Sequence, residues 1–96
     1  MTVSEITAQS VADYLRLSEY TQGDEDFITS CIDVAKDYIS NYTGLASEEL
    51  DECQDLVIVV YVLCQDMYDT RSLYVDNNNV NEVVATILGM HARNLL

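Results

Sequence analysis

Four stretches of the chain repeat apolar residues at helical spacing. The most regular is residues 24–44, in which apolar side chains recur mostly at steps of three and four, with polar side chains between them. This period of about 3.6 residues is typical of an amphipathic helix. Asp24 is the expected N-cap, and Glu25 and Asp26 place negative charge where the helix dipole favours it. Gly44 follows, where a left-handed residue commonly ends a helix.

A shorter helix is predicted over residues 7–17. Thr7 can accept hydrogen bonds from the free N–H groups of its first turn. Ile6 precedes this cap and Val11 follows it by four residues, which is the spacing of a hydrophobic staple. A helix this short has a small apolar face, so it needs the rest of the fold for its stability.

The third stretch, residues 47–70, is predicted as one helix about 36 Å long. Ser47 is its expected N-cap, with Glu48 and Glu49 behind it. The middle, residues 56–64, reads LVIVVYVLC and alone could be a buried strand, but the periodicity on both sides favours a helix. The apolar run is too short to span a bilayer. A helix that is apolar on all sides is central in a bundle or half covered by a neighbouring subunit.

The fourth helix is predicted to follow a polar loop at residues 71–78. Asn79 can cap it, Glu82 completes a capping-box-like pattern, and Gly89 is expected to end it. Its apolar residues are expected to face inward: Val80, Val83, Val84, Ile87 and Leu88. The chain has no proline and 3 glycines among 96 residues. We therefore expect one all-α domain, 1–96, a small bundle of about four helices: one short and N-terminal, two long and central, one C-terminal.

The charge balance is strongly acidic. Lys and Arg number 4 and Asp and Glu 17, giving a formal net charge of −13. Clustered Lys and Arg are needed to neutralise phosphates, so specific binding to DNA and binding to a membrane are not expected. The first ten residues lack the basic start and apolar core of a signal peptide, which predicts a protein that stays in a reducing cytoplasm.

The residues that could bind a metal are not paired. Cys31, Cys53 and Cys64 lie on apolar stripes, and the single histidine, His91, has no partner at zinc-site spacing. The run of acidic residues at 48–55 is typical of a solvated helix start, since a calcium or magnesium site needs a loop that converges its oxygens. We therefore expect no metal and no cofactor.

Catalytic motifs are also missing from the sequence. Residues 76–80 begin like an EF-hand loop, but Val80 stands where a ligand is needed and Asn81 where glycine is needed. The chain has no GxSxG, no glycine-rich phosphate loop and no HExxH. The sequence therefore favours a protein of interaction or assembly over an enzyme.

Two runs resemble the head–tail connector (adaptor) proteins of tailed bacteriophages. Residues 23–44, GDEDFITSCIDVAKDYISNYTG, match the family's first long helix, with its acidic start and Tyr-Thr-Gly ending. Residues 56–72, LVIVVYVLCQDMYDTRS, match a very apolar helix that closes in an aromatic, a polar pair and arginine. The Tyr-Leu-Arg at residues 14–16 and the closing region 83–93 also fit, so the resemblance covers nearly the whole chain.

The resemblance implies a structural virion protein that catalyses no reaction. Such a subunit forms a homo-oligomeric ring that docks on the portal, extends the DNA channel and offers a face to a later head-closure or tail-joining protein. It would lie at the head–tail interface of the virion after assembly in the bacterial host cytoplasm. Double-stranded DNA would pass through without specific binding, because an acidic interior repels it.

The same resemblance assigns two sets of contact residues. Those expected to pack between subunits lie on the long apolar helix: Val57, Val60, Tyr61, Cys64 and Tyr68. Those expected to bind a partner, by analogy the portal, lie in the C-terminal tail: Met90, His91, Arg93, Leu95 and Leu96. Met and Arg are enriched at protein interfaces.

Two other functions fit parts of the sequence. An acidic inhibitor that mimics DNA would use the charge of −13 to bind a basic DNA-binding enzyme, although many of the acidic residues stand at helix starts and not along one surface. A small enzyme or metal-binding bundle is the third alternative, and bound metal in the purified protein would favour it.

Overall fold

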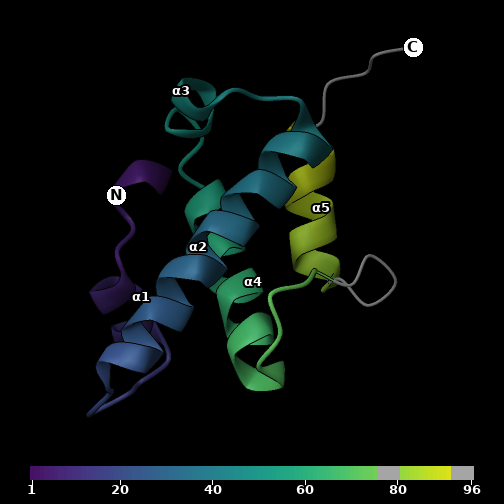
Figure 1. Ribbon diagram of the computed structural model, residues 1–96. Coiled ribbons are helices and arrows are strands. Elements are labelled where there is room, and N and C mark those ends of the chain that lie inside the picture. The colour runs from purple at the N-terminus through teal and green to yellow at the C-terminus, as the bar shows by residue number, and fades with distance from the viewer. Residues whose placement is uncertain (76–80, 92–96) are drawn as a thin grey trace.

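The two long helices, α2 (Gln22–Thr43) and α4 (Leu56–Thr70), pack against each other and form the centre of the fold. The computed structural model describes residues 1–75 and 81–91 (Figure 1). The other elements are the 3₁₀ helix η1 (Val3–Glu5), α1 (Ala8–Tyr14), α3 (Ser47–Leu50) and α5 (Glu82–His91). In the described ranges every regular element is helical, so the predicted all-α bundle is confirmed.

The core lies where α1, α2, α4 and α5 meet. Cys31 of α2 and Cys64 of α4 are fully buried, and so are Val84 and Leu88 of α5. Val3, in η1, and Ile6, which follows it, add two more buried side chains from the N-terminal segment. Fully burying an aliphatic side chain of this size stabilises the fold by about 1.5–3 kcal/mol, so the packed helix faces dominate its stability.

The predicted boundaries of the first two α-helices are partly right. Thr7 caps α1 as expected, because its Oγ1 accepts a hydrogen bond from Ser10 N at 3.1 Å. The α1 helix ends at Tyr14, before residue 17, because Arg16 adopts a left-handed conformation (φ 61°). Leu17 N then donates to Ala12 O at 3.0 Å, which satisfies a carbonyl of the last turn.

The start of α2 corrects the expected cap. Thr21 is the N-cap, and Asp24 is the third residue of the helix. Thr21 Oγ1 accepts from Asp24 N and Asp24 Oδ2 accepts from Thr21 N, both at 3.2 Å, which is a capping box. At the other end Gly44 has φ 76° and donates to Ser40 O at 2.8 Å, so the predicted left-handed end is confirmed.

The single helix predicted over residues 47–70 is wrong, because the chain turns between α3 and α4. Ala46, not Ser47, is the N-cap residue of α3, and Glu49 Oε1 accepts a hydrogen bond from Ala46 N at 3.0 Å. Between α3 and α4 the backbone hydrogen bonds join residues three apart, as in a 3₁₀ turn; Leu56 N, for example, donates to Cys53 O at 3.1 Å. The remaining helix, α4, has 15 residues and is therefore about 22 Å long.

A contact with the N-terminal segment explains this turn. Asp51 follows α3 directly, and its carboxylate accepts hydrogen bonds from Ser4 N at 2.9 Å and from Ser4 Oγ at 2.8 Å. The turn also lets Leu50 and Leu56 both enter the core. A continuous helix would separate these groups, so the tertiary contacts override the helical propensity of residues 51–55.

The last helix also differs from its prediction. Asn81 Oδ1 accepts a hydrogen bond from Val83 N at 2.8 Å at the start of α5. Asn79 and Val80 lie outside the described residues, as do residues 76–78 of the predicted loop. The helix continues through Gly89 to His91, so Gly89 does not end it. Val84 and Leu88 are buried as expected, but Val83 is 58% exposed and faces outward.

Candidate interaction surfaces

One exposed apolar surface joins the N-terminus, α1 and α4. We call it the α1–α4 surface and define it by Met1, Tyr14, Ile58 and Tyr61. The rings of Tyr14 and Tyr61 stack with their centroids 5.0 Å apart, and the Tyr61 hydroxyl donates to Met1 Sδ at 3.3 Å. Ile58, one helical turn before Tyr61, is 54% exposed. Residues 56–64 include no Asp, Glu, Lys or Arg, so this side of α4 is uncharged.

A second apolar surface is the outer face of α5. We call it the α5 surface and define it by Val83, Ile87 and Met90, whose spacing places them on one side of the helix. Val83 is 58% and Met90 67% exposed, while Ile87 is half-buried against the core. Glu82 is the only carboxylate in α5. Like the first, this surface therefore offers apolar atoms with little charge.

These two surfaces lie on opposite flanks of the molecule. Figure 1 shows α1 on one side of α2 and α5 on the other, with the crossing pair α2 and α4 between them. The α1–α4 surface and the α5 surface therefore cannot both be covered by the same part of one neighbouring molecule. Each is available to a separate partner.

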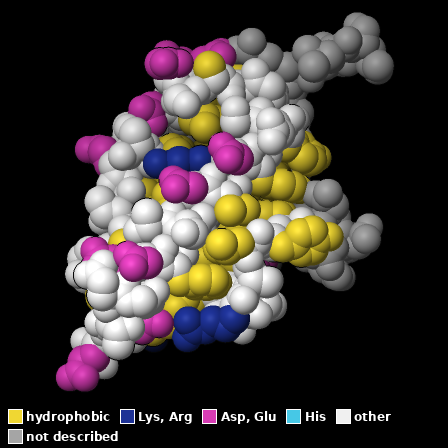
Figure 2. Space-filling view, in the orientation of Figure 1, with side chains coloured by type: hydrophobic (Ala, Val, Ile, Leu, Met, Phe, Trp, Pro, Cys, Tyr) yellow, Lys and Arg dark blue, Asp and Glu magenta, His cyan; other side chains and the backbone are white. Residues whose placement is uncertain are grey.

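A third exposed apolar feature is a shallow groove between α2 and the segment that follows α4. The groove, here the α2–loop groove, has a volume of about 290 Å³ and is lined by Val34, Asp37, Tyr38, Leu73, Tyr74 and Val75. Tyr74 is 66% exposed. Figure 2 shows a band of hydrophobic side chains across this face with acidic side chains near it. Burial raises the pKa of Tyr38, and so does Tyr42, whose ring centroid is 6.1 Å away.

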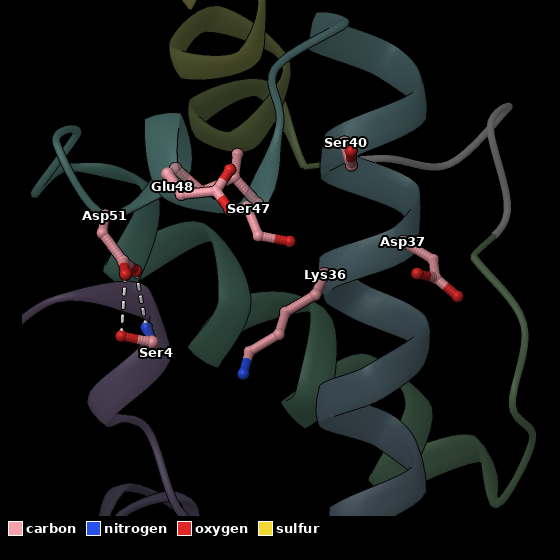
Figure 3. Close-up of a pocket in the computed structure, with 8 residues that line it drawn as sticks. Ser4, Lys36, Asp37, Ser40, Ser47, Glu48 and Asp51 are labelled. Carbon is pink, nitrogen blue, oxygen red and sulfur yellow. Dashed lines mark hydrogen bonds between the residues drawn. The ribbon is translucent and has the colours of Figure 1, made fainter.

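A polar pocket of about 320 Å³ lies on another side of α2, toward η1 and α3 (Figure 3). Lys36 extends into it from α2, and the carboxylates of Glu48 and Asp51 line it from the other elements. Asp51 already accepts two hydrogen bonds from Ser4. The pocket thus brings one cation together with several carboxylates, and the net charge of its lining is negative.

Most of the residues predicted to pack between subunits lie in the core of this chain instead. Val57, Val60 and Cys64 belong to the core of this chain and are no more than 9% exposed, so the expectation that they contact another copy is corrected. Tyr61 lies on the α1–α4 surface. Tyr68 is half-buried beneath Arg71, whose guanidinium carbon lies 4.2 Å from the centre of its ring.

Of the residues predicted to bind a partner, two are described. Met90 is exposed on the α5 surface. His91 is half-buried, and its Nε2 lies 2.8 Å from Asp55 Oδ1, so it connects α5 to the start of α4. Arg93, Leu95 and Leu96 lie outside the described residues.

The cysteines are protected thiols in this fold. Burial raises the pKa of Cys31 to about 11 and that of Cys64 to about 12. Burial also raises the pKa of Cys53, with Asp55 and Glu52 adding to the effect. All three are unpaired. Across residues 1–75 and 81–91 no three His, Cys, Asp or Glu side chains converge on a metal-sized site, and none of the helices there is long and apolar enough to cross a membrane.

Comparison with known proteins gave no match, whether to protein-family models, to characterised proteins or to solved structures. The likeness to head–tail connectors therefore stands on the sequence motifs alone.

Sequence reasoning missed the outward-facing apolar residues. Ile58 and Val60 are both apolar and two positions apart, so they lie on nearly opposite sides of α4, yet only the buried one was assigned to an interface. The predicted polar loop contains two exposed apolar residues, Leu73 and Tyr74, and Val83 is exposed although its spacing predicts a core position. Residues 56–64 carry no charged side chain on any side, so a helical wheel gives no polar face that would mark the side of Ile58 as outward.

Proposed function

We propose that the protein is a structural subunit of a tailed-phage virion, part of a homo-oligomeric ring that docks on the portal, extends the DNA channel and joins head to tail. One observation carries this proposal: two exposed, nearly uncharged apolar surfaces lie on opposite flanks of a strongly acidic molecule. Exposed apolar patches of this kind mark protein–protein contacts.

The positions of the two surfaces favour a ring over a symmetric pair. When one surface of a copy contacts a different surface of the next copy, the interface is heterologous. Repetition of that contact closes into a ring if the rotation between copies allows it. The α1–α4 surface of one copy would meet the α5 surface of the next. A symmetric dimer would instead cover one of these surfaces with its own equivalent and leave the other exposed.

Charge supports the same arrangement. Each copy has a formal charge of −13, so copies repel one another at low ionic strength. Contact through the uncharged side of α4 and through α5 keeps carboxylates out of the interface. The acidic remainder of the ring then faces solvent and the channel, where it repels passing duplex DNA instead of binding it.

The expected partners beyond the ring follow from the same proposal. The portal would contact the C-terminal region that follows Met90, from His91 to Arg93, Leu95 and Leu96, while Met90 itself would pack against the next subunit. A head-closure or tail-joining protein would bind the opposite face of the ring.

The decisive experiment mixes the protein with its cognate portal and images the particles by negative stain. Added ring density on the portal is expected, and it should disappear with Ile58→Glu and with Val83→Glu. Ser18→Glu adds the same charge at an exposed loop position and serves as the matched control. Wild-type protein that adds no density beside a folded portal would overturn the proposal.

Salt separates this function from the acidic DNA mimic. Screening weakens repulsion between like-charged copies, so ring assembly should strengthen between low and physiological ionic strength. A complex with a basic DNA-binding enzyme would weaken over the same range. Figure 2 also shows the carboxylates of one face scattered among apolar and uncharged groups, which supports assembly more than mimicry.

A further inference from the structure

The α2–loop groove is a second kind of contact site, different in charge from the two uncharged surfaces. Its apolar lining comes from α2 (Val34 and Tyr38) and from Leu73, Tyr74 and Val75. Asp37 lines it as well, and Asp33, one turn earlier on α2, is exposed. The groove therefore joins exposed aromatic and aliphatic atoms to a carboxylate rim.

Two of the basic residues that the structure describes already have aromatic or acidic neighbours within this chain. Arg71 is 58% exposed, but its guanidinium already contacts Asp24 at 3.4 Å and lies over the rings of Phe27 and Tyr68. Lys36 points into the polar pocket among carboxylates. A second copy would bring 17 acidic residues and 4 basic ones toward an acidic rim, so charge disfavours self-association at this groove.

We propose that the α2–loop groove binds a segment of a different protein in which apolar residues are flanked by Lys or Arg. The apolar side chains would cover Tyr38, Leu73 and Tyr74, and a basic side chain would pair with Asp37. Charge complementarity sets the partner: opposite charges steer the encounter and discriminate against acidic segments. This site goes beyond the ring contacts proposed above and does not use either of their surfaces.

The groove residues suit a direct test because substituting them spares the core. Leu73 and Tyr74 are exposed, so Leu73→Ser and Tyr74→Ser leave the buried side chains in place. Val83→Ser, on the α5 surface, is the matched apolar control. Asp37→Asn removes the rim charge, and Glu19→Gln, an exposed acidic residue in the loop before α2, is its charge control.

The probe is a fluorescein-labelled synthetic peptide of alternating leucine and lysine, titrated with the full chain and followed by fluorescence anisotropy. A second peptide with glutamate in place of lysine tests the charge. The leucine–lysine peptide is expected to bind, and the Kd should rise about tenfold with Tyr74→Ser and with Leu73→Ser. Asp37→Asn should weaken binding and reduce its salt dependence, while Val83→Ser and Glu19→Gln should leave the Kd unchanged.

Four results would overturn the inference. The leucine–lysine peptide could fail to bind, the glutamate peptide could bind equally well, or the groove variants could bind like wild type. The fourth is a change in sedimentation of the groove variants without peptide, which would assign the groove to a second copy. The ring proposal is judged separately. Rings that form on the portal while the peptide fails to bind would reject only the groove, and peptide binding without rings would reject only the ring.

Discussion

His91 Nε2 lies 2.8 Å from both carboxylate oxygens of Asp55. The pair connects the last turn of α5 to the residue that precedes α4, and the two side chains are 24% and 37% exposed. It therefore holds the C-terminal end of α5, and with it Met90 of the α5 surface, in a fixed position against the central helices.

Breaking this pair should loosen α5 without unfolding the chain. We expect His91→Ala to lower the free energy of unfolding by about 0.5–1 kcal/mol, a value reduced by the partial exposure of both groups. Urea denaturation measures the loss. Asp55→Asn should give a loss of similar size, and the double variant should lose little more than either single one. Full additivity of the two losses would show that the two side chains do not interact.

Two substitutions on α4 should separate folding from assembly. Val60 is fully buried, so Val60→Asp should bury an unpaired charge and unfold the domain, at a cost of several kcal/mol. Ile58 is 54% exposed, so Ile58→Asp should leave the helical content unchanged and prevent assembly. Circular dichroism and sedimentation velocity distinguish the outcomes. A folded, assembling Val60→Asp variant would contradict the orientation of α4.

The thiols should make the domain sensitive to alkaline pH. The pKa of Cys31 is about 11 and that of Cys64 about 12 in the fold, above the ordinary thiol value of 9.0. The folded state thus retains protons that the unfolded state releases, so stability is complete below about pH 9 and falls as pH rises through 11 and 12. Denaturation curves from pH 8 upward measure the loss, and Cys31→Ala with Cys64→Ala should flatten it.

Removing the Asp51 carboxylate should release the N-terminal segment. Asp51→Ala deletes the acceptor of both hydrogen bonds from Ser4, and Val3 and Ile6 should become easier to expose. We expect a loss of about 1 kcal/mol and faster amide exchange at Ser4. Glu52→Ala, at an exposed neighbouring position, is the control and should change neither. Unchanged exchange at Ser4 would contradict this role for Asp51.

Local patterns predicted the parts of the fold that local forces determine. The apolar stripe of α2, its end at Gly44 and the cap at Thr7 depend on residues within a few positions of one another, so periodicity and capping rules located them. The break after Leu50 depends on a contact between Ser4 and Asp51, which are 47 positions apart. No local pattern contains that information.

The candidate surfaces were harder to predict for a related reason. Periodicity identifies apolar positions, but it does not reveal which of them meet the rest of the same chain. Val60 and Ile58 are equivalent in sequence terms, and Val83 resembles Val84 in the same way. Their different exposure follows from how α4 and α5 rotate against α2, which only the assembled fold determines. Met90, expected in the C-terminal tail, lies in α5 and is 67% exposed; its contact with a partner stays a prediction.

The three methionines differ in their exposure to oxidants. Met67 is buried in the core, whereas Met1 and Met90 are 60% and 67% exposed, one on each apolar surface. Conversion of a thioether to its sulfoxide makes a flexible apolar side chain polar, and exposed methionines react first. Mild peroxide treatment would therefore place a polar oxygen on both sides of the proposed subunit contact and leave the core intact. If the ring proposal holds, a preparation stored without a reductant would lose assembly while its helices remain folded.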